Sequence, residues 1–166
     1  MTIPQHWLRA ALAAAALALP AWLQAAPFDG VVTHVTDGDS LWIRPLAGGE
    51  PVEVRLQGID APEICQPHGR QARAALAALA LHRQVTVRPR ARDRYERVLA
   101  RVRLQRQDLG GWMVGQGHAW SDGWRGSRGP YARQQAQASA ARLGLWRSAS
   151  AVDPRTFRQR HGSCRR

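Results

Sequence analysis

Residues 28–63 read FDGVVTHVTDGDSLWIRPLAGGEPVEVRLQGIDAPE, and this stretch determines the fold. Residues 28–36 alternate and are rich in Val and Thr, which predicts a β-strand. The turn residues Asp37-Gly38-Asp39 follow, and Leu41-Trp42-Ile43 opens a second strand. A third strand is predicted over residues 52–59. Because the connections are short, the three strands are expected to form a meander.

Beyond this meander, helix and strand signals alternate. Ala and Leu recur with helical spacing over residues 69–81. A short strand is predicted over residues 85–87, and a second over residues 98–104, where apolar residues alternate with Arg. A charged loop over residues 91–96 separates these two strands.

Two further helices are predicted, over residues 109–115, with Asp108 as the N-cap, and over residues 130–142. From residue 148 onward the chain is polar and basic without periodicity, so residues 148–166 are expected to form a tail. Three strands, a helix, two strands and two helices are typical of an α+β fold. We predict a five-stranded Greek-key barrel of the OB-fold type with about three helices.

The charge of the chain indicates a polyanionic partner. The 166 residues contain 24 basic side chains, all of them Arg, and the formal net charge is +12. Such an excess of positive charge favours binding to nucleic acid, to an anionic membrane surface or to an acidic polysaccharide. Arg presents a planar fork that binds phosphate through two N–H groups. A nucleotide bias that also enriches Ala and Gly would equally explain the lack of Lys.

The N-terminus has the organisation of a secretory signal peptide. Residues 1–9 carry one positive charge, residues 10–22 are an apolar run rich in Ala and Leu, and Ala25 is a small residue suited to cleavage. The run is short for a membrane span. We therefore predict a signal peptide over residues 1–25 and a bacterial periplasmic or secreted protein without membrane attachment. An uncleaved anchor is the alternative.

Cys65 and Cys164 are the two cysteines of the chain. In an oxidising compartment an isolated pair usually forms a disulfide, which would hold the C-terminal tail beside the segment after Glu63. Two free thiols are the alternative.

Two carboxylates are candidates for binding a metal. Asp39 and Asp60 each flank a tight turn at a strand end, and neighbouring strands of a meander bring such positions together at the rim of a barrel. Two carboxylates with a backbone carbonyl and waters can bind a hard cation. Oxygen ligands favour calcium over zinc, and no His/Cys cluster has zinc spacing. A local role in the turns is the alternative, because Asp is common there for its hydrogen bonds to the backbone.

Three segments together resemble the staphylococcal nuclease (thermonuclease-like) family. They are Asp37-Gly38-Asp39-Ser40, Arg55-Leu56-Gln57-Gly58-Ile59-Asp60-Ala61-Pro62-Glu63 and Asp93-Arg94-Tyr95-Glu96-Arg97. The resemblance extends from about Phe28 to Trp146 and is most specific over residues 55–63. It implies a thermonuclease-like domain over residues 27–147.

The resemblance also implies a calcium site. Asp39 and Asp60 would bind Ca²⁺, with the backbone carbonyl of Ala61 as a third protein ligand. The family often has Thr where this chain has Ala61, and a backbone ligand tolerates that change. Asp37 would support the metal-binding turn from behind.

Catalytic roles follow from the same resemblance. Glu63 would act as general base or position the attacking water, and Arg55 and Arg97 would bind the phosphate and its developing charge. Tyr95 would contact phosphate or nucleotide, although packing is an equal alternative. Glu96 replaces the Gly that the family usually has before Arg97, and a purely structural role is the alternative for this Arg.

The activity implied is that of a calcium-dependent endonuclease with DNA and RNA as substrates, little sequence specificity and 3′-phosphate products. We expect a monomer with no stable protein partner. A non-catalytic OB-type module that only binds nucleic acid is the main alternative, and the complete set of Asp, Arg and Glu residues argues against it. A secreted Arg-rich protein that binds polyanions would leave residues 55–63 unexplained.

A Gly- and Trp-rich loop is predicted over residues 117–129, and the region from His118 to Tyr131 departs most from the family pattern. Trp120, Trp124 and Tyr131 could each stack on a base or pack against the barrel. They are not assigned to the site, and the six His residues are expected to be structural or to lie on the surface.

Overall fold

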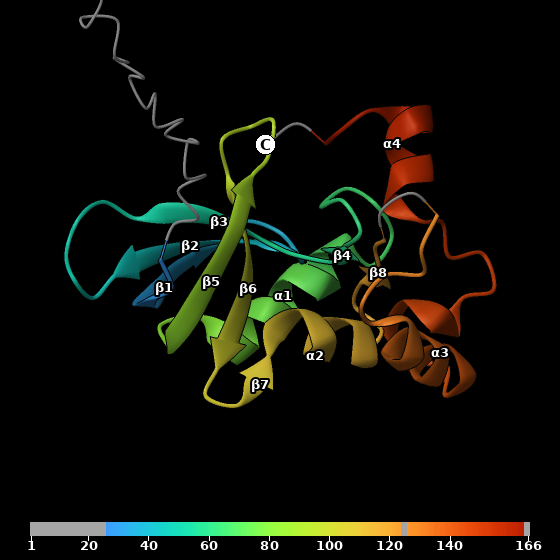
Figure 1. Cartoon of the computed structure of the whole chain (residues 1–166). Coiled ribbons are helices and arrows are strands. Elements are labelled where there is room, and N and C mark those ends of the chain that lie inside the picture. The colour runs from blue at the N-terminus through green and yellow to red at the C-terminus, as the bar shows by residue number, and fades with distance from the viewer. Residues whose placement is uncertain (1–25, 124–125, 165–166) are drawn as a thin grey trace, which may run out of the picture.

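The computed structural model describes residues 26–123 and 126–164, and its elements follow one another along the chain as in Figure 1. The strands are β1 (Phe28–Val35), β2 (Ser40–Pro45), β3 (Val52–Leu56), β4 (Ile59–Asp60), β5 (Gln84–Arg92), β6 (Val98–Leu104), β7 (Gln107–Asp108) and β8 (Trp120–Ser121). The helices are α1 (Gly69–Ala80), α2 (Leu109–Gly115), α3 (Ala132–Ala140) and α4 (Pro154–His161), with a 3-10 turn, η1 (Gly144–Arg147).

The predicted signal peptide, residues 1–25, and Trp124 lie outside the described residues. Within the part of the chain that the structure describes, no helix is long and apolar enough to cross a membrane.

Five strands close into a barrel. The order β3-β2-β1-β5-β6 is antiparallel throughout, and β3 and β6 pair in parallel, with Val54 opposite Val98. Alternate residues of each strand point inward and are fully buried, among them Val32, Ile43, Val54, Val87 and Val102. The predicted α+β fold with a five-stranded OB-type barrel is confirmed.

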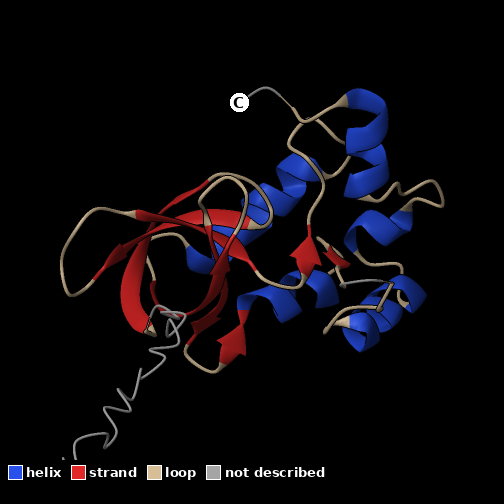
Figure 2. Cartoon of the chain, turned by 45° about the horizontal axis from the view of Figure 1, so that its top comes forward, coloured by secondary structure: helices blue, strands red, loops and turns tan. Residues whose placement is uncertain are grey.

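Helices surround one side of the barrel. α1 buries Ala72, Leu76 and Ala80, which recur every fourth residue and therefore share one face of the helix. Figure 2 shows the barrel strands on one side of the molecule and α3 and α4 on the other. α1 and α2 lie between them and share one hydrophobic core with the barrel strands.

Two strand predictions need correction. The predicted strand over residues 52–59 is two strands, because Gly58 takes a φ of +80° and turns the chain between β3 and β4. β4 then pairs with β8 instead of continuing in the barrel. The predicted strand over residues 85–87 is longer, since β5 pairs with β1 and with β6. The charged loop is correspondingly shorter.

The prediction of an irregular tail is wrong over α4, which is a fourth helix. The side chain of Asp153 accepts a hydrogen bond from the backbone N–H of Thr156 at 2.9 Å, and Pro154 follows at the first turn. A capping Asp followed by Pro is a helix-start signal, and it was present in the sequence.

The turn between β5 and β6 holds Glu96 in the left-handed region, with a φ of +63°. The Glu96 N–H donates to the carbonyl of Asp93 at 3.0 Å, and the Arg97 N–H donates to the Asp93 carboxylate at 3.1 Å. The turn therefore keeps the backbone conformation that suits Gly although its residue is Glu. Such a conformation costs a residue with a Cβ about 1–2 kcal/mol.

Replacing Glu96 by Gly should raise the free energy of unfolding by about 0.5–1 kcal/mol, since relief of this strain exceeds the added entropy of Gly in the unfolded chain. Urea denaturation measures the change. Glu96→Ala is the matched control, because it removes the carboxylate and keeps the Cβ. An equal gain in both variants would assign the effect to charge and not to the backbone.

His68 and His118 form a partly buried pair. Nε2 of His68 lies 2.9 Å from Nδ1 of His118, and the rings stack with centroids 5.1 Å apart. Burial and the charge of His68 together lower the pKa of His118 to about 4, with burial the larger cause. Burial and the charge of Arg147 lower the pKa of His68.

Because the pKa of His118 is lower in the folded than in the unfolded chain, the unfolded chain binds more protons between pH 6.5 and about 4. This group's contribution to stability is therefore complete above pH 6.5 and is lost as the pH falls toward 4. Urea denaturation at several pH values should give a shallower acid loss for His118→Asn than for the wild type. His34→Asn, at an exposed position, should follow the wild-type curve.

Candidate active site

The turn before β2 brings Asp39 against the segment that follows β4. A Cβ at Gly38 would lie 2.7 Å from the Ala61 Cβ and 2.8 Å from the Ala72 Cβ, so only Gly allows this approach. The Ala61 N–H donates to Asp39 Oδ2 at 3.0 Å, and the Asp39 N–H donates to Asp37 Oδ1 at 3.0 Å. Asp37, Asp39 and Ala61 are thus next to one another.

Arg55 connects the two Asp residues that the sequence singled out. Its NH2 group lies 3.0 Å from Asp60 Oδ1 and 3.3 Å from Asp39 Oδ2. The register of β2 and β3 explains the placement, because Arg55 pairs directly with Ser40, the neighbour of Asp39. The structure therefore unites Asp39, Asp60 and Arg55 at one end of the barrel.

Burial and neighbouring charges shift the pKa values of Asp39 and Arg55 at this site. Asp39 is only 4% exposed, and burial raises its pKa against the lowering effect of the Arg55 charge. Asp37 adds a further negative charge that raises the same pKa. The charge of Asp39 in turn raises the pKa of Arg55 above its ordinary value, despite burial. The carboxylates of this turn thus favour additional positive charge nearby.

Arg97 is held by Asp93 and by Ser40. Its Nε donates to Asp93 Oδ2 at 2.8 Å, and its NH2 lies 2.7 Å from the same oxygen. Its NH1 donates to Ser40 Oγ at 3.3 Å, while that hydroxyl donates to Asp39 Oδ1 at 2.9 Å. Ser40 therefore links Arg97 to the Asp39 side of the site.

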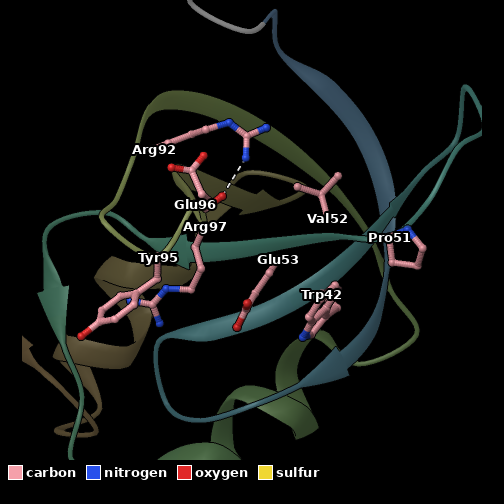
Figure 3. Close-up of a pocket in the computed structure, with 8 residues that line it drawn as sticks. All are labelled: Trp42, Pro51, Val52, Glu53, Arg92, Tyr95, Glu96 and Arg97. Atoms are coloured by element: carbon pink, nitrogen blue, oxygen red, sulfur yellow. Dashed lines mark hydrogen bonds between the residues drawn. The ribbon is translucent and has the colours of Figure 1, made fainter. Parts of the chain in front are cut away.

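Tyr95 projects into solvent beside these groups. It is 60% exposed, and the Arg97 guanidinium carbon lies 5.4 Å from the centre of its ring. Figure 3 shows Tyr95 and Arg97 side by side in a pocket that Trp42 and Glu53 also line. Exposure of this ring favours contact with a ligand over packing in the core.

Glu63 and Asp60 share a partner that the sequence analysis missed, Arg158 of α4. Its NH1 lies 3.0 Å from Glu63 Oε1 and donates to Asp60 Oδ1 at 3.1 Å. Its NH2 lies 2.8 Å from Asp60 Oδ2. The only sequence signal was the helix start before it, and no local pattern connects α4 to residues 60–63.

Two anchors hold the C-terminal segment beside Glu63. The structure joins Cys65 and Cys164 in a disulfide, with Cα atoms 5.8 Å apart. The Gln66 side chain donates to the Val152 carbonyl at 2.6 Å and accepts from the Glu63 N–H at 3.2 Å. Both ends of the segment that contains α4 are therefore attached immediately after Glu63.

The unassigned aromatic residues have structural contacts. Tyr131 is buried, and its hydroxyl donates to the Asp108 carboxylate at 2.7 Å. The Trp120 ring packs edge-on against that of Trp146 with centroids 5.4 Å apart. Tyr131 therefore serves the attachment of α3 to α2, and Trp120 lies in β8, opposite Asp60.

The oxygen atoms at the site suit a hard cation. Among residues 26–123 and 126–164, no group of three or more His, Cys, Asp or Glu side chains is arranged for a metal. Two carboxylates, Asp39 and Asp60, stand beside the backbone of Ala61, and burial raises the pKa of Asp39 because it disfavours the charged form. This donor set fits calcium and lacks the nitrogen and sulfur ligands of zinc.

Comparison with known proteins gives consistent matches. The model of the family "Staphylococcal nuclease homologue" matches residues 53–148. The micrococcal nuclease of Shigella flexneri is 35% identical over 92% of this chain and 92% of its own length. An uncharacterized endonuclease of Haemophilus influenzae is 34% identical over 77% of this chain and 71% of its own length.

Protein ParB of Escherichia coli is 37% identical over 90% of this chain and 88% of its own length, and its name states no activity. The family match covers more than half of the chain and includes Arg55, Glu63 and Arg97, while Asp39 precedes it and α4 follows it. With the barrel, the clustered carboxylates and the extended similarity in hand, this chain belongs to the staphylococcal nuclease homologue family.

Proposed function

We propose that this chain is a secreted, calcium-dependent endonuclease that hydrolyses DNA and RNA with little sequence specificity and leaves 3′-phosphate ends. Family membership and the names of two relatives support nuclease activity. The observation that carries the proposal is the contact of Arg55 with both Asp39 and Asp60, on the same edge of the barrel as Glu63.

Asp39, Asp60 and the Ala61 carbonyl are the groups that would hold calcium, and Asp37 would keep the turn in place through its bond to the Asp39 N–H. When bound, a divalent cation polarises a phosphate oxygen and lowers the pKa of water. The protein supplies the preformed turn, because Ser40 and the Ala61 N–H orient the two oxygens of Asp39.

Glu63, Arg55 and Arg97 then have different roles in hydrolysis. Glu63 orients a water and accepts its proton, for which a carboxylate within hydrogen-bonding reach is sufficient. Arg55 and Arg97 bind the phosphate, whose negative charge increases as the fifth oxygen approaches. One well-placed Arg can contribute about 10³-fold or more to phosphoryl transfer. The water attacks phosphorus, the bond between phosphorus and the 5′ oxygen breaks, and the 5′ oxygen leaves as a hydroxyl after it takes up a proton from solvent. The phosphate therefore stays on the 3′ side.

Low sequence specificity follows from the chemistry of the contacts. Arg side chains recognise the backbone phosphates, which carry no sequence information. The exposed ring of Tyr95 can stack on any base, because every base has a π-face. An unpaired strand gives better access to that face, so single-stranded or frayed nucleic acid is the preferred substrate.

Glu63→Gln should lower the rate of hydrolysis by about 10²–10⁴-fold, since it removes the proton acceptor and keeps the shape of the side chain. Digestion of single-stranded DNA and of RNA with calcium, and with chelator in its place, measures the loss. Glu50→Gln, at an exposed position of the β2–β3 loop, is the matched control and should retain wild-type activity.

Wild-type activity that persists under chelation would refute the calcium assignment, and full activity of Glu63→Gln would refute the role of Glu63. Nucleic-acid binding without hydrolysis in the wild type would favour the alternative, a non-catalytic OB-type binding module.

Asp39→Asn should weaken calcium binding by about tenfold or more, because a neutral amide replaces a charged ligand. Isothermal titration calorimetry with Ca²⁺ measures the dissociation constant directly, without reference to activity. Unchanged binding in this variant would place the cation elsewhere, and Glu50→Gln again serves as the control.

Secretion and the disulfide can be checked on one sample. Protein exported by a bacterial host should begin at Ala26, and its intact mass should be lower than that of the reduced chain by two hydrogen atoms. An intact N-terminus would indicate an anchor. Two thiols that alkylate without reductant would contradict the bond between Cys65 and Cys164.

A further inference from the structure

We propose that Arg158 is a third arginine of the active site, which α4 places to contact the phosphodiester beside Glu63. The inference rests on the proposed nuclease function and adds a substrate-binding residue to it. Arg158 lies ten residues beyond the segment that the family model matches, so the role of this residue comes from the contacts of this chain.

The first argument is that Arg158 and Arg55 bind the same carboxylate. Asp60 Oδ1 accepts from Arg55 NH2 at 3.0 Å and from Arg158 NH1 at 3.1 Å. The two guanidinium groups thus converge on one carboxylate from β3 and from α4. A phosphate that Arg55 can reach at this edge lies within the neighbourhood of Arg158 as well.

The second argument is its contact with Glu63. The NH1 group of Arg158 lies 3.0 Å from Oε1 of Glu63, the carboxylate that would accept the proton of the attacking water. A group at that distance from the base is close to the reacting phosphorus as well. With the charge of Asp60 compensated by a cation, the planar fork of Arg158 can turn its N–H groups toward a phosphate oxygen.

The third argument is the way α4 is attached. The bond from Gln66 to the Val152 carbonyl fixes the start of the segment, and the disulfide from Cys65 to Cys164 fixes its end. Both anchors leave from residues directly after Glu63. The arginine is therefore positioned relative to the base by a short, doubly attached segment and not by a free tail.

The partial exposure of the Arg158 side chain also suits contact with a ligand. The Arg158 side chain is 30% exposed, which leaves part of the guanidinium open to a ligand while Asp60 and Glu63 orient it. Arg155 and Arg160 on the same helix are exposed, so α4 adds positive charge to the surface around the site. A polyanionic strand is attracted to such a surface.

The test compares Arg158→Gln with Arg160→Gln, which makes the same charge change two residues away and on another face of α4. Arg158→Gln should lower kcat/KM on single-stranded DNA by about 100-fold, and Arg160→Gln by no more than about threefold. Arg158→Lys keeps the charge but cannot bind with a fork, so it should recover only part of the loss.

A binding measurement separates substrate contact from structural support. In the Glu63→Gln background with calcium, fluorescence anisotropy of a short labelled oligonucleotide should give weaker binding for Arg158→Gln. The dependence of log K on log salt concentration should fall by about 0.7, as expected for one lost phosphate contact on a single strand. Arg160→Gln should match its parent more closely on both measures.

The anchors give a second test that leaves Arg158 in place. Replacing Cys65 and Cys164 together by Ser should lower kcat/KM in the same direction, because α4 loses its attachment at one end. Arg158→Gln added to this variant should then cost less than it costs in the wild type. Equal costs in the two backgrounds would overturn the role of the anchor.

Two results would overturn the proposal, and a third would overturn the proposed function alone. If Arg158→Gln and Arg160→Gln have the same kcat/KM and the same anisotropy curves, Arg158 does not contact the substrate. Higher activity and tighter Ca²⁺ binding in Arg158→Gln would instead identify α4 as a segment that blocks the site. If the wild type fails to hydrolyse nucleic acid, the proposed function is wrong, and the anisotropy comparison still decides whether Arg158 binds the strand.

Discussion

The contact of Arg55 with Asp39 and Asp60 is the interaction on which the rest of the site depends. β3 carries Arg55 and pairs with β2 on one side and β6 on the other, so closure of the barrel fixes this side chain. Ser40 lies opposite Arg55 in the register, and its hydroxyl accepts a hydrogen bond from Arg97. One pairing register thus brings together groups from three strands.

Burial of charge at this edge has a cost that the arrangement offsets. A buried carboxylate is stable only with compensating charge and hydrogen bonds. Asp39 has Arg55, Ser40 and the Ala61 N–H, and burial still raises its pKa. Further positive charge beside Asp39 would favour its charged form, and a divalent cation would supply such charge. Arg158, from the far end of the chain, supplies positive charge to Asp60 and Glu63.

The C-terminal segment extends the barrel domain with a separately attached helix. Cys65 and Cys164 are 99 residues apart, and closing a loop of that length restricts the unfolded chain by about 4–5 kcal/mol in the chain-entropy description. α4 itself buries little apart from Pro154. Its position therefore depends on the disulfide, on Gln66 and on the ion pairs of Arg158 more than on apolar packing.

The sequence alone determined the barrel and the local motifs, because alternation, helical spacing and turn residues are properties of neighbouring positions. It indicated that Asp39 and Asp60 approach each other, since both flank turns of one meander. Prediction from the sequence failed where the strands that pair are distant along the chain. The break at Gly58 is stabilised by the pairing of β4 with β8, and the length of β5 is set by two partner strands. Only the tertiary structure placed Arg158 on Asp60 and Glu63, because a contact across 95 or more residues is decided by how the chain closes and leaves no periodic trace.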